Sequence, residues 1–421
     1  MNSHDFALQM DQADVLKSFR NQFFHNPSEI YLDGNSLGKL PLKTQEIIQN
    51  TLNEQWGHSL ISSWNKNWLA LPKRISDKFA RLLNTNPKEI IIGESTSVRL
   101  YQLVFSLLNS KRFPLNIVTD HLQFPSDRYI LEGLANQFNL KGVTVIDYGQ
   151  EIFADEEQLK QSISQKPGIY CLSLVTYKSS YRYNLLELNQ WAARYNSIIV
   201  WDFSHAVGAL EIDCKTTKTL LAVGCTYKYM NGGPGAPAFL YIHETLLPYL
   251  SNPIQGWFGH NNPFLFADFY ESAKGIERFG IGTPPILSLQ AIEVGVDIIL
   301  KAGIRNLEQK SHALGAYFIS LIEELIHTTP FCIESPTAAQ QRGSHVSLSH
   351  PKAWQICQAL QDQTIGDKKI IPDFRPPHFI RFGITPLYTS YSDLWETAQQ
   401  LVLIESQKVY ENYPTDYSSV P

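Results

Sequence analysis

The chain has 421 residues, of which 43% are hydrophobic and 18% are charged, so it is long enough and apolar enough to bury a sizeable core. Its formal charge is -5, from 35 Lys and Arg against 40 Asp and Glu, and no stretch concentrates basic residues. This composition excludes a disordered chain and argues against a nucleic-acid-binding protein.

The cysteines and the amino-terminal residues indicate the cellular compartment in which the protein is expected. The five cysteines are scattered and never form a C-x-x-C pair, which argues against a disulfide framework and a thiolate metal site. The first residues show no basic segment followed by an apolar stretch, and no run of about 18 apolar residues occurs. We therefore expect a soluble, cytoplasmic protein of enzyme size that binds no metal, no membrane and no nucleic acid.

Apolar runs and turn residues predict the elements in chain order. Residues 13–24 place Leu16, Phe19 and Phe23 at helical spacing, and Pro41 opens a second expected helix that ends at Trp56. Strand-like runs then alternate with helical stretches, and they cover residues 89–93, 115–119, 142–148, 169–175, 197–202, 220–225 and 238–242. This alternation is typical of an α/β fold with a mostly parallel central sheet flanked by helices.

The pattern changes after residue 280. A turn at residues 282–285 precedes an expected amphipathic helix over residues 286–302, and the remainder alternates strands and helices in a different register. We predict an N-terminal segment over residues 1–40 that packs with the small domain, a large domain over residues 41–300, and a small α+β domain over residues 301–421.

Ionisable residues follow two of the expected strands, at the strand ends where open α/β sheets bind their ligands. The run 197–201 is followed by Asp202, with His205 three residues on, and the run 220–225 is followed by Lys228 and a Gly-rich turn. Alone, Asp202 is explained equally well as a helix cap, and Lys228 as a side chain that extends to solvent. Together they match the needs of pyridoxal phosphate (PLP), a Schiff-base lysine and a carboxylate that keeps the pyridine nitrogen protonated.

That cofactor also needs a phosphate site and a stacking partner. Thr96 and Ser97 lie at the start of an expected helix, where hydroxyls and free N–H groups bind an anion, although an ordinary helix cap gives the same pattern. Phe124 is a candidate for stacking on the ring, with Asp127 placed to contact ring substituents. The indole N–H of Trp257 is a candidate for the phosphate.

An amino-acid substrate further requires a cation for its carboxylate. Arg381 lies between apolar residues, where an unpaired charge is costly, and its two-pronged guanidinium suits a carboxylate. Arg342 and Arg375 compete for this role, and either of them can instead form a structural ion pair.

The blocks that contain these residues resemble the kynureninase family, PLP-dependent hydrolases of kynurenine. The matching blocks span nearly the whole chain: YLDGNSLGKLP (31–41), STSVRL (95–100), FPSDRYI (124–130), WDFSHAVGALEID (201–213), CTYKYMNGGPGAPAFLY (225–241), GWFGH (256–260), IGTPPILSL (281–289), RGSHVSL (342–348) and IRFGITPLYTSYSDLW (380–395). The lysine block is common to aminotransferase-like PLP enzymes, whereas NSLG, FPSD, GW-x-GH and RFG-x-TPLY are much narrower.

The resemblance implies fold type I of the PLP-dependent enzymes and a homodimer with shared active sites. The implied catalytic residues are Lys228, Tyr227 and Asp202, and the implied substrate-binding residues are Arg381, Ser36, His58 and Thr283. The implied cofactor-binding residues are Thr96, Ser97, Phe124, Asp127, Ser173, Asp202, His205, Tyr227, Lys228, Trp257 and Thr283. The chain departs from the family where a His and a Gly are usual, at Leu174 and Ser180, and it has Thr283 where some members have Asn.

The implied reaction is hydrolysis of the Cβ–Cγ bond of L-kynurenine or 3-hydroxy-L-kynurenine, a step of tryptophan catabolism, with Tyr227 as the expected proton carrier. The alternatives are a cysteine desulfurase or a small aminotransferase of the same fold and, less well supported, a non-catalytic protein of that fold. Against a desulfurase, Cys332 and Cys357 lie in apolar or helical stretches and are expected to be structural. A metal hydrolase is weaker still, because His58 and His260 have no ligand-type spacing to other histidines.

Overall fold

The large sheet forms one half of the molecule in the computed structural model, which describes residues 3–150 and 152–416. Its seven strands lie in the order β2 (Ile90–Ile92), β8 (Phe239–Ile242), β7 (Leu221–Gly224), β6 (Ile198–Asp202), β5 (Ile169–Ser173), β3 (Ile117–Asp120) and β4 (Val143–Ile146). All neighbouring strands are parallel except at β8, which runs antiparallel to both of its neighbours. The mostly parallel sheet is thus confirmed, and each strand overlaps an expected apolar run.

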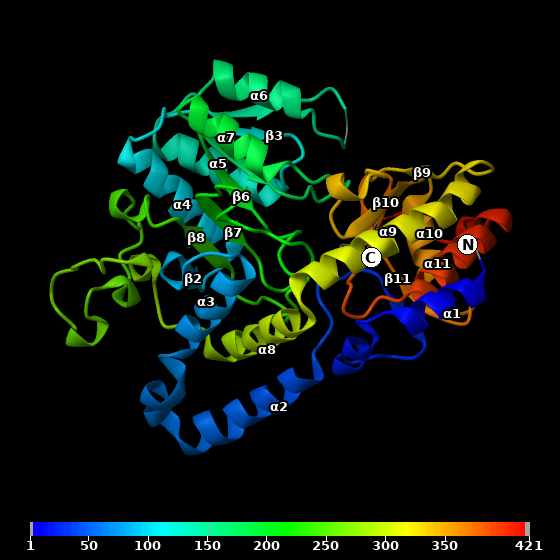
Figure 1. The fold of residues 1–421 in the computed structure, drawn as a ribbon, viewed down its shortest axis with the longest axis horizontal. Helices are drawn as coiled ribbons and strands as arrows, with labels where there is room; N and C mark the ends of the chain where they lie inside the picture. The colour runs from blue at the N-terminus through cyan, green and yellow to red at the C-terminus, as the bar shows by residue number, and fades with distance from the viewer. Residues whose placement is uncertain (1–2, 151, 417–421) are drawn as a thin grey trace.

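Helices cover both faces of this sheet (Figure 1). One face packs against α3 (Leu71–Leu82), α6 (Glu156–Gln165), α7 (Leu185–Arg194) and α8 (Ile286–Ala302), and the other against α4 (Thr96–Ser110) and α5 (Pro125–Gln137). Strand β5 shows why the strands are continuous apolar runs: Tyr170 and Leu172 join the first core, while Ile169 and Cys171 join the second. Helix α8 has the bounds predicted from the sequence.

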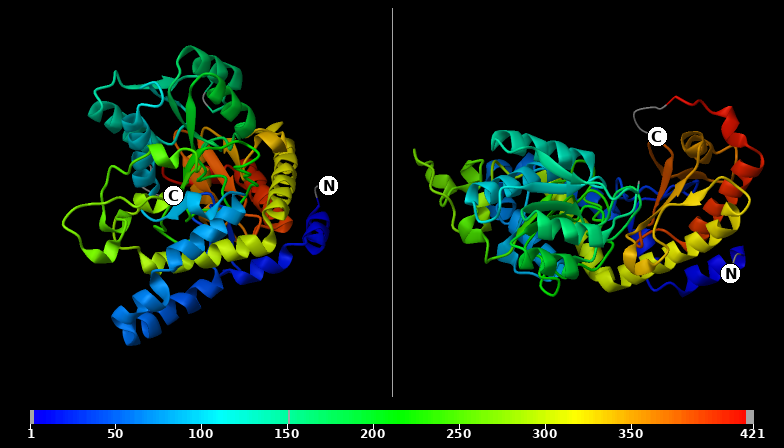
Figure 2. Two further views of the ribbon diagram at one scale, coloured as in Figure 1. Left: turned by 60° about the vertical axis from the view of Figure 1, so that its left-hand side comes forward. Right: turned by 90° about the horizontal axis from the view of Figure 1, so that it is seen from above.

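A second body follows Gly303, whose positive φ of 82° separates α8 from α9 (Ile304–Ile326). It contains an antiparallel sheet in the order β12 (Asp373–Arg375), β13 (Phe379–Gly383), β10 (His345–Ser349) and β9 (Cys332–Ile333), with helices α10 (Ala353–Gln361) and α11 (Tyr391–Ser406). Its buried side chains form a hydrophobic core of their own. Figure 2 shows this smaller body beside the large one.

The N-terminal segment lies against the C-terminal body. Helix α1 (His4–Ala13) packs on α11, and β1 (Glu29–Tyr31) pairs in parallel with β11 (Lys369–Ile371). The helix expected over residues 13–24 is wrong, because the carboxylate of Asp14 accepts a 2.8 Å hydrogen bond from the backbone N–H of Leu16 and so ends α1. A short 3-10 helix over Lys17–Gln22 follows instead. The exact division into domains stays a prediction.

A helical arm, residues 42–69, projects from the large body (Figures 1 and 2). Helix α2 (Leu42–Asn50) continues into a π-helix over Thr51–His58, and short helical turns over Leu60–Ser62 and Trp64–Trp68 lead back to α3. The arm rests on α8, and its far end exposes Trp56, Leu60 and Ile61 to solvent. Exposed apolar side chains on a projecting segment indicate a contact surface.

Candidate active site

A cavity of about 200 Å³ lies at the carboxyl ends of the central parallel strands. Ten of the residues predicted for the site line it: Ser36, Thr96, Ser97, Phe124, Asp127, Asp202, His205, Tyr227, Lys228 and Arg381. Sequence reasoning missed Asn35, Ser126 and Ser204, each inside a family block, and it treated Arg375 only as a competitor of Arg381. The cavity therefore unites residues from both bodies and from the N-terminal segment.

Asp202 is the last residue of β6 and is buried below the cavity. Ser204 donates two hydrogen bonds to its Oδ1, from the backbone N–H at 2.9 Å and from the hydroxyl at 2.6 Å. Burial raises the pKa of Asp202, against the influence of Ser204 and Lys228. Ser173 ends β5 directly beside Asp202 in the strand register and is buried there, outside the cavity lining.

A second buried acid faces the same space. Burial raises the pKa of Asp127 to about 8, and the neighbouring charge of Asp202 contributes. Nε2 of Gln123 donates a 2.6 Å hydrogen bond to Asp127 Oδ2. One lysine, Lys228, lies beside the two buried carboxyl groups. A further cationic group placed between them would stabilise both as carboxylates.

Lys228 reaches the cavity from the loop after β7. Its Nζ lies 2.8 Å from Nε2 of His205, a side chain with only 5% of its surface exposed. Burial lowers the pKa of His205 well below its usual value, and the charge of Lys228 lowers it further. The imidazole is therefore neutral, and the lysine is held in place by a neutral partner rather than by an ion pair.

The N-terminal segment crosses the lysine loop at Gly38. Its N–H donates a 2.8 Å hydrogen bond to the carbonyl of Tyr227, and a Cβ at position 38 would lie 2.3 Å from the carbonyl oxygen of Lys228. Only glycine allows this approach. The crossing explains the Gly of the NSLG block, and it brings Asn35 and Ser36 into the cavity.

Arg381 closes the opposite side of the cavity. It lies directly across from Asp373 in the register of β12 and β13, and its Nε donates to Asp373 Oδ2 at 2.5 Å. Its Nη1 donates to the Tyr177 carbonyl at 2.6 Å, and its Nη2 donates to Oγ of Ser36 at 3.2 Å. Arg375 donates to the same carboxylate at 2.9 Å, so that two arginines share one acid and leave positive charge facing the cavity.

Two helices begin at the cavity. Ser95 caps α4 by accepting a hydrogen bond from the N–H of Val98, and Thr96 and Ser97 follow in the first turn. Helix α5 begins after Phe124, and Ser126 in its first turn lies with its Oγ 3.3 Å from that of Ser97. Free N–H groups and hydroxyls at two helix starts form a site for an anionic group.

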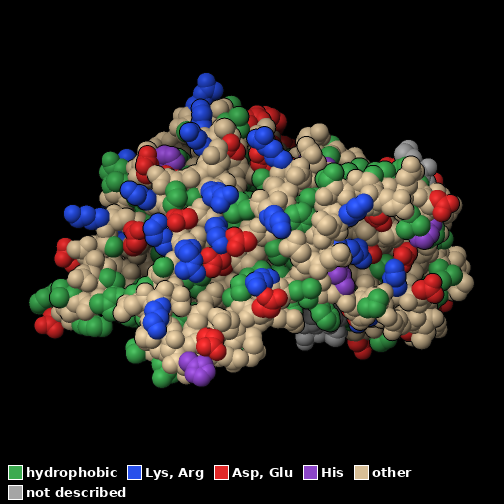
Figure 3. Space-filling model, turned by 60° about the horizontal axis from the view of Figure 1, so that its bottom comes forward, with side chains coloured by type: hydrophobic (Ala, Val, Ile, Leu, Met, Phe, Trp, Pro, Cys, Tyr) green, Lys and Arg blue, Asp and Glu red, His purple; other side chains and the backbone are tan. Residues whose placement is uncertain are grey.

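Besides Ser173, three predicted site residues lie outside the cavity of their own chain. His58 is exposed in the arm, Thr283 is exposed in the turn before α8, and Trp257 is 38% exposed in a 3-10 helix, Trp257–Gly259. The rings of Trp64 in the arm and Phe258 lie 6.4 Å apart, so the arm and the loop around Trp257 belong to one surface. Figure 3 shows hydrophobic side chains gathered at the tip of this loop.

The structure corrects the interpretation of Cys332. Cys332 is exposed, because β9 is a two-residue strand at the edge of its sheet, whereas Cys357 is buried as expected. Cys332 does not line the cavity. Within residues 3–150 and 152–416, no group of three or more potential metal ligands occurs, and no helix has the length and apolarity of a membrane span.

Solved structures with this architecture define the class of protein. A cysteine desulfurase from Thermococcus onnurineus superimposes with a TM-score of 0.78 at 17% identity over 94% of this chain and 98% of its own. A mutant of C-DES with glycine covalently linked to its PLP cofactor superimposes with a TM-score of 0.75 at 16% identity over 91% and 98%. The chain thus has fold type I of the PLP-dependent enzymes, as the sequence predicted.

Within that class, the amino-acid sequence of the chain is more similar to one family. The kynureninase from Pseudomonas fluorescens is 35% identical over 415 residues, which is 97% of each chain. The model of the kynureninase C-terminal domain matches residues 307–401. The chain belongs to the kynureninase family, which confirms the resemblance seen in its sequence blocks.

Proposed function

We propose that this protein is a kynureninase, which hydrolyses the Cβ–Cγ bond of L-kynurenine or 3-hydroxy-L-kynurenine to anthranilate or 3-hydroxyanthranilate and L-alanine. Full-length similarity to kynureninases supports a hydrolase of carbon–carbon bonds with PLP as its cofactor. The observation that carries the proposal is a single cavity lined by Lys228, Asp202 and Arg381. These groups suit a cofactor linkage, a ring-nitrogen contact and a substrate carboxylate.

The cavity residues fit PLP. Asp127 and Asp202 are buried acids with raised pKa values, and a protonated ring nitrogen supplies the positive charge that they lack. Thr96 and Ser97 suit the phosphate, and Phe124 lines the cavity as a flat partner for the ring. When bound, PLP supplies an electron sink for negative charge on the substrate carbons next to the amine.

Each residue then has a defined role. Lys228 holds the cofactor and afterwards removes the proton from Cα of the substrate, with its Nζ oriented by His205. Asp202 keeps the proton on the ring nitrogen. Burial raises the pKa of Tyr227, so its phenol stays protonated at neutral pH and can donate while water adds to the γ-carbonyl.

The substrate carboxylate binds at the arginine end. Arg381 has 1% of its surface exposed and directs part of its guanidinium toward Ser36 at the cavity wall. Asp373 and the carbonyl of Tyr177 hold the guanidinium in place, which limits the rotamer freedom lost when substrate binds.

Replacement of Lys228 tests the proposal. Lys228→Ala should abolish kynurenine hydrolysis and the visible absorbance of protein-linked PLP, because no other lysine lines the cavity within the described residues. Lys215→Ala, at an exposed lysine outside the cavity, is the matched control and should retain both. Anthranilate fluorescence and alanine release report the activity. Retained hydrolysis in Lys228→Ala would contradict the proposed role.

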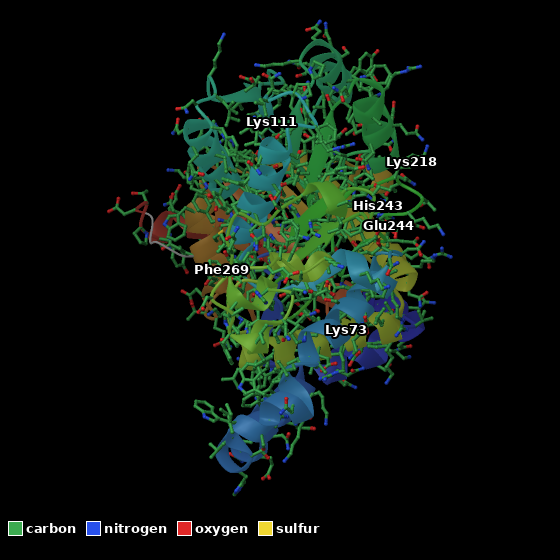
Figure 4. All side chains as sticks on the ribbon, turned by 90° about the vertical axis from the view of Figure 1, so that its left-hand side faces the viewer. Lys73, Lys111, Lys218, His243, Glu244 and Phe269 are labelled. Atoms are coloured by element: carbon green, nitrogen blue, oxygen red, sulfur yellow. The ribbon has the colours of Figure 1, made fainter. Side chains whose placement is uncertain are left out.

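We also propose a homodimer in which each chain completes the site of its partner. The arm and the loop after Gly256 each expose apolar side chains: Trp56, Leu60, Ile61, Trp257, Phe264, Leu265, Phe266 and Phe269. Phe269 is 86% exposed, and Figure 4 labels it on this side of the molecule, with the arm projecting below. A second copy that covers this surface would carry His58, Trp257 and Thr283 toward the neighbouring cavity.

Mixed dimers test this arrangement. Chains with Lys228→Ala and chains with His58→Ala combined with Trp257→Ala should each be nearly inactive alone. A dimer of one chain of each kind restores one complete site, with Lys228 from one chain and the arm and loop from the other. Recovery of about half of the activity per mixed dimer is expected for two independent sites. No recovery in dimers confirmed by tandem-tag purification would reject the shared site.

Location and substrate preference extend the proposal. The five cysteines are free, which supports a reducing, cytoplasmic compartment. Thr283 replaces the Asn of some family members at the aryl end, so the ratio of kcat/KM for kynurenine and 3-hydroxykynurenine in wild type and Thr283→Asn measures its contribution.

A further inference from the structure

A second buried histidine lies behind the one that contacts Lys228. His345 is the first residue of β10 and has no exposed surface, and its ring centroid lies 5.7 Å from that of His205. Within the described chain, neither ring nitrogen of His345 has a hydrogen-bond partner, and Nδ1 of His205 lacks one as well. Buried polar atoms without partners are costly, so three of them at one place require an explanation.

The surrounding charges keep both imidazoles neutral. Burial lowers the pKa of His205 well below its usual value, and Lys228, Arg381, His345 and Arg375 each lower it further. Burial likewise lowers the pKa of His345, with Arg381 and Lys228 as the cations that face it. A neutral imidazole has one donor nitrogen and one acceptor nitrogen, so the position of each proton decides what the ring can do.

The contact with Lys228 determines the proton on His205. Where Nζ of Lys228 donates in this contact, Nε2 of His205 accepts and the ring proton lies on Nδ1. That N–H requires an acceptor, and the neighbouring ring of His345, with its centroid 5.7 Å from that of His205, carries two nitrogens without a hydrogen-bond partner in the described chain.

We propose that His345 is a positioning residue that fixes the tautomer of His205 and thereby the orientation in which Lys228 takes up and releases its proton. The inference rests on the proposed function, in which Lys228 holds the cofactor and transfers a proton. His345 does not line the cavity and acts only through His205. The chain of groups runs from His345 through His205 to Lys228 Nζ.

Two variants of the PLP-loaded enzyme test the proposal. His345→Leu removes both ring nitrogens with little change in volume, and His345→Gln restores one donor and one acceptor. The first readout is the pH dependence of the visible absorbance of bound PLP without substrate, and the second is the pH profile of kcat. For His345→Leu we expect a shift of about one pH unit in the absorbance midpoint and a loss of about tenfold in kcat. His345→Gln should restore most of both.

The control is His350→Leu, which removes another buried histidine just beyond β10. His350 packs on Phe331 and Tyr410, away from the cavity, and its replacement should leave the absorbance titration unchanged. An unchanged midpoint in His345→Leu would overturn the proposal. Equal shifts in Leu and Gln variants, with equal losses of thermal stability, would show a space-filling role and overturn it as well. Because the absorbance readout needs no kynurenine, it separates this inference from the proposed activity.

Discussion

Replacement of Arg381 by Met separates substrate binding from structural support. The fork of Arg381 is the group we assign to the substrate carboxylate, and its loss removes two charge-assisted hydrogen bonds. Each is worth about 1.5–3 kcal/mol, so kcat/KM should fall by roughly 10² to 10⁴. Asp373 keeps Arg375 as a partner at 2.9 Å, so the loss of folding stability should stay below the about 3–5 kcal/mol of a fully orphaned buried charge.

The assay compares two substrates. Kynurenine carries the carboxylate, and the amine formed from it by loss of that carboxylate does not. Wild type should have a much higher kcat/KM for kynurenine than for the amine. Arg381→Met should remove most of this difference by lowering kcat/KM for kynurenine, while the rate for the amine should change little. PLP absorbance and thermal unfolding report intact folding, and Arg305→Met, at an exposed arginine outside the cavity, is the control. Equal losses on both substrates would refute the assignment and leave Arg381 a structural residue.

Three further changes test the site. In the folded protein the pKa of Asp127 is raised to about 8, so the free energy of unfolding of the cofactor-free protein should fall as pH rises from about 4 to 8. In urea unfolding, Asp127→Asn should remove this dependence. Parallel plots of unfolding free energy against pH for wild type and variant would contradict the prediction. Asp202→Asn should lower kcat by about 10² to 10⁴-fold while PLP stays bound, with PLP absorbance reporting the bound cofactor and steady-state kinetics reporting kcat. Turnover near that of wild type would reject the proposed role of Asp202 at the ring nitrogen. Cys332→Ser should leave kynurenine hydrolysis unchanged, and neither wild type nor this variant should release alanine from cysteine; alanine release from cysteine that Cys332→Ser abolishes would revive the desulfurase alternative.

The strands of the large body, and the site residues that follow them, could be predicted from the sequence because local patterns of apolar residues determine where these strands lie. Buried parallel strands are continuous apolar runs, and their carboxyl ends meet at one edge, so Asp202 and Lys228 could be brought together without coordinates. Helix α8 lies in the core over most of its length, so its pattern was strong enough to give its bounds.

Other features depend on contacts that a linear pattern does not contain. Asp14 ended a helix through its side chain, and the exposure of Cys332 depends on its place at a sheet edge. Asp373 becomes the partner of Arg381 only through the pairing of β12 with β13. Ser180 shows the same limit: it adopts a positive φ of 67° where the family usually has Gly, and its Oγ accepts the backbone N–H of His345 at 3.4 Å.

The two ends of the cavity come from different bodies and carry different ionisable groups. The large body supplies Asp127 from α5 and Asp202 from β6, whereas the small sheet supplies Arg375 and Arg381, which share Asp373. Under the proposed function, a bound amino acid would be aligned with its carboxylate at the arginines and its amine toward Lys228. In a site shielded from water these charges act strongly, so the alignment depends on how the two bodies are held together. The crossing of the N-terminal segment at Gly38 joins this segment, which packs on the small body, to the lysine loop itself, so the proposed substrate clamp and the lysine are linked by a direct backbone contact.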